Sequence, residues 1–585
     1  MIYKQYESDL ALPTISQQIL YNRGISVDNI EKWINASIDD INSPWDFGKE
    51  KVKNALKLID AAMLDNRDIW ILVDCDADGF TSAAIIINFL YKFDNELKDK
   101  IHYILHTGKQ HGLEDTIEQF PEKCLVILPD SSTNDTEQMQ QLYEKDCWVV
   151  CLDHHEADDY LEDNEKRVII NNQISDYPNK NISAAGVVWQ LCRAWDKVFI
   201  TDYANDFVDL AALGILSDMM DYREIENKAI ISFGLNNIKN PFFYYMVEKN
   251  QFSINKMGGI NYMSIAFYVT PFINAIVRSG TMEEKDLVFK SFLTMYAFEK
   301  VESGKRGHKG ELVPRVEEAI RIATNVKSRQ SKLQDAAMAL LELRIAEHNL
   351  NENAIIVITC NPGEVEKNIA GLVANKIQAK YQRPTLVLTK SKDIEDEEYF
   401  YRGSARNYSM SEIQDLRQVC LDSGLVEYAQ GHANAFGSSI AESNLDKFVN
   451  YINQLYENVS QEPIYWVDVI WKKDMVDPQA ILEIANDKDY WGQEITEPYV
   501  CLQDIRLSTI DIKPLAWDKN PTLKLHLDCG VDVMKFKSSD AELNAFKQSN
   551  AIGTFICRCN KNEWNGKITP QLIVEDYSLR EEWIF

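Results

Sequence analysis

The sequence predicts an α/β fold with a parallel sheet in the N-terminal half of the chain. Three short apolar runs are each followed within two residues by an aspartate, and segments with helical patterning separate them. The runs lie at residues 69–73, 125–128 and 148–152. Buried runs of this length that alternate with helices are typical of parallel strands. Because ligands bind at the carboxyl ends of such strands, we expect Asp74, Asp130 and Asp153 to lie close together along one edge.

The rest of the chain divides into further segments by pattern. Residues 281–350 are mostly helical and charged, a second α/β pattern follows, and short β-type runs broken by Gly, Pro and Asn fill the C-terminal part. We therefore predict five segments. They are an N-terminal helical segment (1–60), an α/β catalytic domain (61–280), a helical connector (281–350), a second α/β domain (351–460) and a β-barrel (461–585).

Composition excludes several classes of protein. With 61 Lys and Arg against 90 Asp and Glu, the formal net charge is −29, which argues against coating of nucleic acid by bulk charge. The longest apolar run, residues 83–91, is about half of the ~20 residues that a membrane helix needs. The first residues do not follow the order of a signal peptide. Eleven scattered cysteines are not a disulfide framework, so we expect a cytoplasmic protein without membrane contact.

The motif Asp74-Cys75-Asp76-Ala77-Asp78-Gly79 is the strongest chemical signal, and it lies between a predicted strand and a predicted helix. Three carboxylates within five residues repel one another unless a cation neutralises them. Hard divalent cations prefer such oxygen ligands. A solvated acidic turn and part of a calcium loop are the alternatives, but the glutamate of a calcium loop is missing, since a buried helix is predicted to begin instead.

Asp153-His154-His155, at the end of a predicted strand, is the second signal. Imidazole together with carboxylates suits Mn²⁺, Fe²⁺ or Zn²⁺. A histidine pair taken alone is more often a pair of solvent-exposed residues without a functional role. Its place at a strand end beside two other strand-end aspartates favours a metal site.

Together these segments resemble the DHH phosphoesterase superfamily, and more narrowly the RecJ single-stranded-DNA-specific exonucleases. Asp74 to Gly79 is similar to the first motif of that family, Asp130 to the second, Asp153-His154-His155 to the third, and Asp218 to the fourth. Similar elements follow in order along nearly the whole chain. They are Ser183 to Val187, Pro271 to Arg278, Asn325 to Gln330, Ile369 to Asn375, Gly403 to Arg406, Gly431 to Gly437 and Asn562 to Gln571. One departure is Asp130-Ser131-Ser132, where the family usually has Asp-Asn-Gly or Asp-Cys-Gly.

The resemblance implies a fold and a site. The fold is a DHH domain, a long connector helix, a DHH-associated α/β domain and an oligonucleotide-binding barrel. The site is a two-metal phosphodiesterase centre with two Mn²⁺ or Mg²⁺ ions. The implied ligands are Asp76, Asp78, Asp130, His154 and Asp218, with Asp74 either a ligand or a partner of one. Asp153 is expected to orient His154, and His155 to sit beside the scissile phosphate. The implied substrate contacts are Asn274, Arg278, Ser404, Arg406, Gly431 and His432.

The activity implied by the resemblance is degradation of single-stranded DNA from the 5′ end to 5′-mononucleotides, in repair or recombination. Candidate protein partners are a single-strand-binding protein or a helicase. Two alternatives are a phosphodiesterase for short RNA oligonucleotides or cyclic dinucleotides, and a non-catalytic DNA-binding scaffold. Residues 300–332 carry nine Lys and Arg against four Asp and Glu. This stretch either solvates a helix or contacts a DNA backbone.

Overall fold

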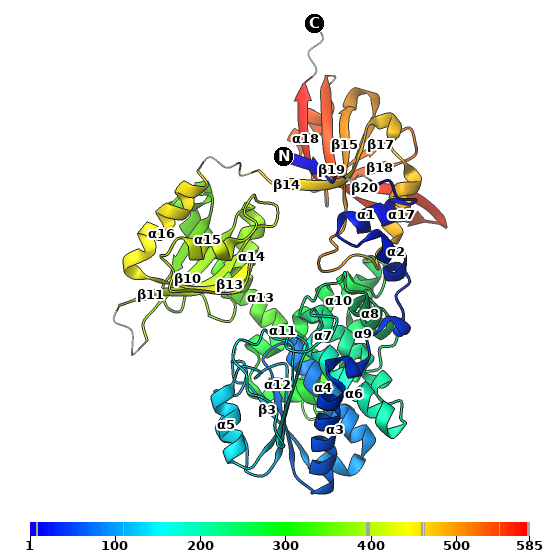
Figure 1. The fold of residues 1–585 in the computed structure, drawn as a ribbon. Helices are drawn as coiled ribbons and strands as arrows, with labels where there is room; N and C mark the ends of the chain where they lie inside the picture. Colours follow the sequence, from blue (N-terminus) through cyan, green and yellow to red (C-terminus); the bar gives the residue numbers. More distant parts are fainter. Residues whose placement is uncertain are drawn as a thin grey trace. The chain divides into compact units, whose positions relative to one another are not determined.

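The computed structural model describes residues 1–7, 10–108, 110–393, 398–457, 460, 462–548 and 550–581 (Figure 1). The chain forms two compact units. Unit 1 comprises Met1–Asn22, Arg329–Asp487 and Glu497–Phe585, and unit 2 comprises Arg23–Ser328 and Lys488–Thr496. None of the described helices has an apolar stretch sufficient to span a bilayer. The last predicted segment begins at residue 461, which lies outside the described residues. The division into five segments stays a prediction.

Unit 2 contains a five-stranded parallel sheet with the order β3-β2-β4-β5-β6. The strands are β2 (Ile69–Val73), β3 (Ile101–Leu105), β4 (Leu125–Pro129), β5 (Trp148–Asp153) and β6 (Arg167–Asn171). The three central strands are apolar along their length because helices cover both faces. The structure confirms the predicted parallel sheet and adds β3 and β6 at its two edges.

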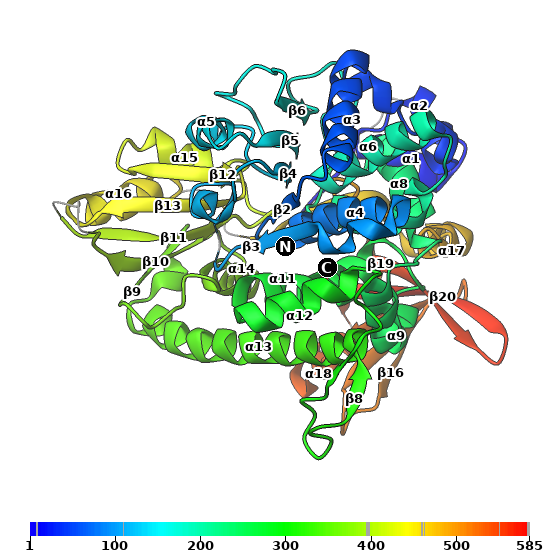
Figure 2. The ribbon, with the colours of Figure 1, turned by 90° about the horizontal axis from the view of Figure 1, so that it is seen from below.

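Helices pack on both faces of this sheet. Figure 2 shows α3, α4 and α6 on one face and α5 on the other. The helices of unit 2 are α2 (Val27–Ile34), α3 (Lys49–Leu64), α4 (Ala77–Phe93), α5 (Thr136–Glu144), α6 (Ala184–Phe199), α7 (Val208–Ser217), α8 (Ile225–Leu235), α9 (Pro241–Lys256), α10 (Tyr262–Tyr268), α11 (Thr270–Ser279) and α12 (Met282–Phe292). Helix α4 is buried on all sides from its first residue to Leu90, because it packs against the sheet, α6 and α7. This burial fixes the position of the helix start, where the acidic motif lies.

A short antiparallel hairpin precedes the longest helix of the chain. It consists of β7 (Lys300–Glu302) and β8 (Leu312–Pro314), and α13 (Arg315–Glu347) follows directly. At 33 residues, α13 is the long helix that the sequence predicts for the connector.

The second sheet, in unit 1, has the order β12-β13-β11-β10-β9, with only the β9–β10 pair parallel. Its strands are β9 (Ile356–Cys360), β10 (Thr385–Ser391), β11 (Phe400–Arg406), β12 (Tyr428–His432) and β13 (Ala435–Ala441). Helix α14 (Ala370–Tyr381) and the end of α13 share one apolar cluster with this sheet. Helices α15 (Leu416–Asp422) and α16 (Glu442–Leu455) share another.

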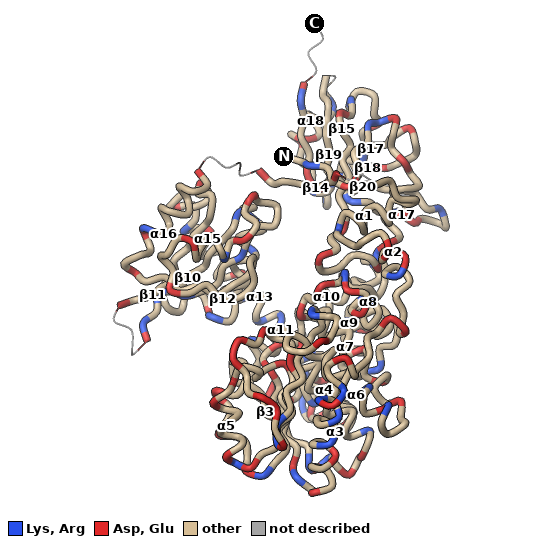
Figure 3. The backbone as a smooth tube through the Cα atoms, in the orientation of Figure 1, with Lys and Arg blue, Asp and Glu red and all other residues tan. Residues whose placement is uncertain are grey.

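The last part of unit 1 is an eight-stranded mixed sheet of order β1-β14-β15-β19-β20-β18-β17-β16. Its β1–β14, β14–β15 and β18–β20 pairs are parallel, and the other four pairs are antiparallel. Its strands are β1 (Ile2–Gln5), β14 (Ile464–Trp471), β15 (Tyr499–Arg506), β16 (Asp511–Leu515), β17 (Thr522–His526), β18 (Asp532–Phe536), β19 (Ala551–Trp564) and β20 (Lys567–Glu581). Helices α1 (Ile15–Asn22), α17 (Pro478–Asn486) and α18 (Asp540–Phe546) accompany it. Strand β1, which the sequence analysis did not identify, pairs in parallel with β14. Figure 3 marks the charged residues along the backbone, and acidic and basic positions are interspersed in both units.

Candidate active site

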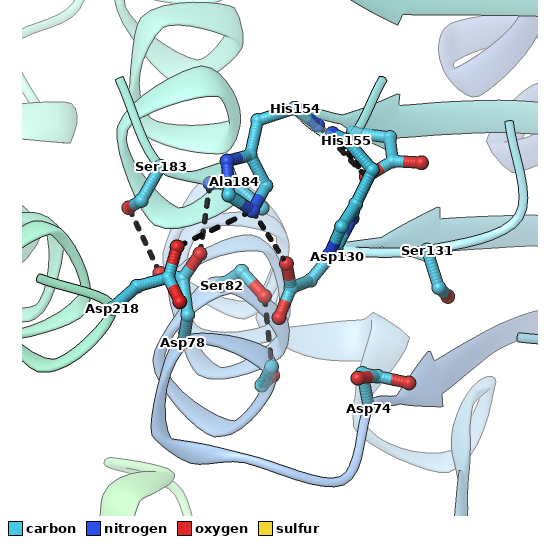
Figure 4. A network of polar contacts seen from close by, with 12 residues as sticks. Asp74, Asp78, Ser82, Asp130, Ser131, His154, His155, Ser183, Ala184 and Asp218 are labelled. Atoms are coloured by element: carbon cyan, nitrogen blue, oxygen red, sulfur yellow. Dashed lines mark hydrogen bonds and ion pairs between the residues drawn. The ribbon is translucent and has the colours of Figure 1, made fainter. Parts of the chain in front are cut away.

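The carboxyl edge of the parallel sheet collects the strand-end residues (Figure 4). Asp74 directly follows β2, Asp130 directly follows β4, and Asp153 is the last residue of β5. All three side chains are buried. The predicted convergence of these carboxylates is therefore what the structure shows.

The acidic motif wraps around the first turn of α4. Asp76 caps the helix, and its Oδ1 accepts a hydrogen bond of 2.9 Å from the backbone N–H of Gly79. A Cβ atom at position 79 would lie 2.7 Å from the carbonyl oxygen and the Cβ of Asp74. The motif thus needs glycine because the helix start approaches the end of β2 closely, and not because the backbone there turns into the left-handed region.

Asp78 joins α4 to the N-terminus of α6. Its Oδ1 accepts from the hydroxyl of Ser183 at 2.9 Å and from the N–H of Ala185 at 3.2 Å, and its Oδ2 accepts from the N–H of Ala184 at 2.8 Å. A helix N-terminus stabilises a carboxylate. Burial and the neighbouring Asp76 nevertheless raise the pKa of Asp78 to about 7. A Cβ at Gly214 in α7 would come within 2.3 Å of Asp78 Oδ1, so this glycine leaves room for the carboxylate.

The six predicted metal ligands fall into two groups of three. Within each group, one donor atom per residue lies within 4.8 Å of the others. The first group is Asp78, His154 and Asp218, and the second is Asp74, Asp76 and Asp130. His154 connects the two groups, because its Nε2 lies 3.5 Å from Asp218 Oδ2 and 3.3 Å from Asp130 Oδ1 (Figure 4).

The buried carboxylates of this cluster lack the hydrogen bonds that would satisfy them. Among the described residues, neither carboxylate oxygen of Asp130 has a hydrogen-bond partner. The same holds for Oδ1 of Asp74. Burial, followed by the charges of Asp78, Asp76, Asp74 and Asp218, holds the pKa of Asp130 well above its ordinary value. Burial and the charges of Asp78 and Asp76 also raise the pKa of Asp218 well above the ordinary value. Unsatisfied buried oxygens of this kind need a counter-charge.

The donor set fits a pair of hard divalent cations. Five carboxylates and one imidazole supply mainly oxygen ligands, as Mn²⁺ and Mg²⁺ prefer. Asp130 belongs to the second group, and its unsatisfied Oδ1 lies 3.3 Å from Nε2 of His154, which belongs to the first group. This arrangement suits a carboxylate that serves two ions.

Asp153 and His155 form a separate pair beside this cluster. Asp153 Oδ1 lies 2.8 Å from Nδ1 of His155 and accepts from the backbone N–H of His154, while Oδ2 accepts from the hydroxyl and N–H of Thr133. Burial alone would raise the pKa of Asp153, but the contacts with His155 outweigh it and lower the pKa. Burial lowers the pKa of His155, but the hydrogen bond with Asp153 raises it by more. The net result is a pKa of about 9.

This pair adds a contact that the sequence analysis did not predict. We expected Asp153 to orient His154 through the second ring nitrogen, and that role stays a prediction. The structure places the ring of His155 against the carboxylate of Asp153, just after the end of β5. The side chain of His155 is half exposed, so its ring is accessible to a substrate.

Two histidines that the sequence analysis missed contact Asp74. His111 Nδ1 lies 2.6 Å from Asp74 Oδ2, and the buried His106 places Nε2 3.7 Å from Oδ1. Both follow β3, the edge strand that was not predicted. The segment Ile101–Leu105 is apolar except for His102, and His106 directly follows it. It thus repeats, in weaker form, the pattern of a strand followed by a polar ligand.

The second motif departs from the family pattern where its backbone is unusual. Asp130 has φ 67° and Ser132 has φ 78°, both in the left-handed region that favours glycine. The family usually has glycine at the position of Ser132. This chain therefore keeps the turn with a residue that adopts it at a cost of about 1 kcal/mol or more.

The predicted substrate contacts lie in both units. Asn274 and Arg278 are half-buried, one turn apart on α11, and this helix packs against α4 in unit 2. In unit 1, Arg406 of β11 and His432 of β12 are both paired with Ala435 of the intervening β13, so they share one face of that sheet. The remaining two positions are Ser404 and Gly431, on β11 and β12. A Cβ at Gly371 would lie 2.4 Å from the guanidinium of Arg406, so α14 covers this face.

Comparison with known proteins places the chain in a family. The model of the DHH family, N-terminal domain, matches residues 68–215. YorK of the SPbeta prophage in Bacillus subtilis (strain 168), which is named as a single-strand DNA-specific exonuclease, is 32% identical over 571 residues, covering 96% of this chain and 95% of that protein. The chain belongs to the RecJ-like DHH exonucleases. The RecJ single-stranded-DNA-specific exonuclease of Bacillus subtilis is 23% identical and covers 100% of this chain, which spans 70% of that protein.

Solved RecJ-like structures show the same fold. The crystal structure of RecJ in complex with Mn²⁺ from Thermus thermophilus aligns with 99% of this chain and 80% of that chain, at a TM-score of 0.67 and 17% identity. The complex of the same protein with Mg²⁺ gives a TM-score of 0.61. The predicted α/β architecture is thus confirmed, because the chain shares the fold of these RecJ structures.

Proposed function

We propose that this protein is a metal-dependent exonuclease that degrades single-stranded DNA from the 5′ end to 5′-mononucleotides, in DNA repair or recombination. The observation that supports it most is the pair of donor groups joined by His154, with unsatisfied carboxylate oxygens on Asp130. The printed names of YorK and of the RecJ relatives support single-stranded DNA as the substrate. A cytoplasmic location and a single-strand-binding protein or a helicase as partner belong to the same proposal.

The proposed metal ligands are Asp74, Asp76, Asp78, Asp130, His154 and Asp218. A bound pair of Mn²⁺ or Mg²⁺ ions would supply an activated water and positive charge for the reacting phosphate. Other residues of the chain would position the reacting phosphate. Asp153 holds the ring of His155 through Nδ1, so the other nitrogen of this ring is free to hold a proton against a phosphate oxygen.

Arginine side chains would bind the phosphates of the strand. Arg278 on α11 and Arg406 on β11 each present a planar guanidinium, which meets two phosphate oxygens at once. Asn274, Ser404, Gly431 and His432 complete the proposed substrate contacts. Arg406 and His432 share one sheet face, so they would bind the same stretch of backbone.

End-labelled substrates test the proposal. Single-stranded DNA, duplex DNA and single-stranded RNA are labelled at the 5′ or the 3′ end and incubated with and without Mn²⁺. The expected result is release of labelled mononucleotide at early times from 5′-labelled single-stranded DNA, only with metal. Early mononucleotide release from the 3′ label, or equal cleavage of the duplex, would contradict the polarity or the strand preference.

Variants connect the activity to the site. Asp76→Ala and His154→Ala are expected to abolish cleavage and leave the fold intact, whereas Asp60→Ala, a half-buried carboxylate on α3, serves as a control that keeps activity. Full activity of Asp76→Ala or His154→Ala would rule out the proposed metal site.

A further inference from the structure

The β7–β8 hairpin of unit 2 carries a cationic loop that the proposed active site does not use. Its loop, residues 303–310, reads Ser-Gly-Lys-Arg-Gly-His-Lys-Gly and contains Lys305, Arg306 and Lys309 but no acidic residue. All three cationic side chains are exposed. In a chain of net charge −29, this is a local concentration of positive charge.

The backbone of the loop is fixed by two consecutive β-turns. The N–H of His308 donates to the carbonyl of Lys305 at 3.0 Å, and the N–H of Glu311 donates to the carbonyl of His308 at 3.1 Å. The third residue of each turn is a glycine with positive φ, 86° at Gly307 and 87° at Gly310. This conformation is typical of type II turns and requires glycine. Arg306 and Lys309 therefore occupy equivalent second positions of two successive turns.

The base of the hairpin is anchored to the body of unit 2. The N–H of Gly304 donates to the buried carboxylate of Glu318 in α13 at 3.1 Å, and Arg321 binds the same carboxylate. Arg315, at the start of α13, pairs with Glu299 at 2.9 Å. Figure 2 shows the hairpin extending from the start of α13. The cationic loop thus projects from a rigid base.

The cations of the loop differ from the other basic residues nearby. Within the part of the chain that the structure describes, Lys305, Arg306 and Lys309 form no ion pair, whereas Arg315 and Arg321 are each held by a carboxylate. A Cβ added at Gly307 or Gly310 would meet open space. Three uncompensated cations in open space, held by a defined backbone, suit a polyanion better than a compact ligand.

We propose that the hairpin loop 303–310 binds the phosphate backbone of the DNA strand, at a place separate from the proposed metal ligands. The proposal rests on the proposed function, because a DNA substrate is the polyanion that the protein meets. The strongly acidic chain repels DNA as a whole, so local cations are needed to hold a strand during repeated cleavage. Each phosphate that a cation neutralises on a single strand contributes about 0.7 to the salt dependence of binding.

The test compares a triple variant, Lys305→Gln/Arg306→Gln/Lys309→Gln, with the wild type. Binding of a 3′-fluorescein-labelled single strand of about 30 nucleotides is measured by anisotropy in EDTA, over a series of salt concentrations. Three lost contacts lower the slope of log affinity against log salt by about 2. A tenfold rise in salt would then weaken the variant about 100-fold less than the wild type.

A matched control removes the same charge elsewhere in unit 2. The variant Lys49→Gln/Lys57→Gln/Lys249→Gln neutralises three exposed lysines and is expected to keep the wild-type slope. A conservative variant, Lys305→Arg/Lys309→Arg, should also keep it. The substituted side chains project into solvent, so all variants are expected to fold, which circular dichroism checks.

The outcomes separate this proposal from the proposed function. If the triple variant has the same salt slope of DNA binding as the wild type, the hairpin proposal is overturned. This result is also expected if the loop binds an acidic protein instead of DNA. The control variant losing as much slope as the triple variant overturns it too, because the effect is then one of net charge. A wild-type protein that neither binds nor degrades single-stranded DNA overturns the proposed function and the hairpin proposal with it.

Discussion

Replacement of Asp130 by asparagine should stabilise the protein without metal and remove most of the stabilisation that bound metal gives. Asparagine keeps the shape of the side chain and removes its charge. In EDTA we expect Asp130→Asn to be more stable than the wild type, because an unsatisfied buried carboxylate among other carboxylates is lost. With Mn²⁺ we expect the wild type to gain stability and the variant to gain little, because a member of the second donor group, which also approaches His154, can no longer bind as an anion.

The magnitude follows from the spacing of the carboxylates. Donor oxygens of Asp74 and Asp76 lie within 4.8 Å of one on Asp130. At an effective dielectric constant of about 20, each ionised neighbour at that distance repels Asp130 by about 3.5 kcal/mol. Raised pKa values mean that part of the cluster holds protons without metal, so we expect a net stabilisation of about 1–3 kcal/mol. For a unit of roughly 300 residues this corresponds to about 2–5 °C in Tm.

The assay is thermal unfolding in EDTA and in MnCl₂, followed on the transition of unit 2. At a metal concentration of about 100 times the Kd, the wild type should gain about 2.7 kcal/mol, or roughly 4 °C. Asp209→Asn is the matched control, since this buried carboxylate accepts hydrogen bonds from the N–H groups of Leu210, Lys239 and Asn240. It should lower Tm in both conditions and leave the response to Mn²⁺ unchanged.

The reasoning would be refuted by two results. If Asp130→Asn lowered Tm in EDTA as Asp209→Asn does, the carboxylate would be structural and not a site of repulsion. If Mn²⁺ raised the Tm of the variant as much as that of the wild type, Asp130 would not hold the metal.

Three further predictions concern residues around the site. The pKa of His155 is raised to about 9, so stability from its pair with Asp153 should be complete below about pH 6.5 and lost as pH rises through 9. His155→Gln should remove that alkaline loss, which we expect to be about 1 kcal/mol by urea unfolding because the ring is half exposed. Ser132→Gly should raise the free energy of unfolding by up to about 1 kcal/mol, because glycine adopts φ 78° without strain. His111→Ala should weaken Mn²⁺ binding roughly 10-fold in titrations followed by electron paramagnetic resonance, because the ring that holds Asp74 is lost.

Each of these has a comparison that can contradict it. A pH profile of unfolding that is the same in His155→Gln and the wild type would show that the pair does not contribute. Ser131→Gly should not stabilise the protein, since its φ is not in the left-handed region. His102→Ala is the control for His111→Ala, because the Nε2 of His102 on β3 lies 3.8 Å from Asp68 and not beside Asp74. Equal weakening of Mn²⁺ binding in the two variants would refute the role of His111.

The central strands of the catalytic sheet could be predicted because each has a clear local pattern. Strands β2, β4 and β5 are continuous apolar runs followed by aspartate, and their burial on both faces makes that pattern visible. The edge strand β3 escaped because only Ile101 and Ile104 are buried, and His102, whose ring stacks on Trp70 of β2, interrupts the apolar pattern. Strand β1 was missed because its only strand partner among the described residues is β14, which lies at Ile464–Trp471, far later in the chain.

The candidate site was predictable to the level of which residues meet, and less so to the level of what each contacts. The acidic motif and the strand ends supply five of the six clustered side chains, and Asp218 comes from the end of α7. The direction of each side chain depends on distant backbone, such as the α6 N-terminus that binds Asp78 and the turn after β5 that gives Asp153 the ring of His155. Such contacts depend on tertiary structure, and no local pattern encodes them.

The pairing of β1 with β14 has a consequence for biosynthesis. The ribosome delivers residues 2–5 long before residues 464–467, and at about 5–20 residues per second this delay is about 25–90 s. Unit 2, which lies almost entirely between them in the chain, has time to fold during translation, while the first strand waits without its partner. Nascent chains arrested near residue 400 should therefore already resist proteolysis over residues 23–328, and their leading segment should become protected only after the rest of the polypeptide has emerged.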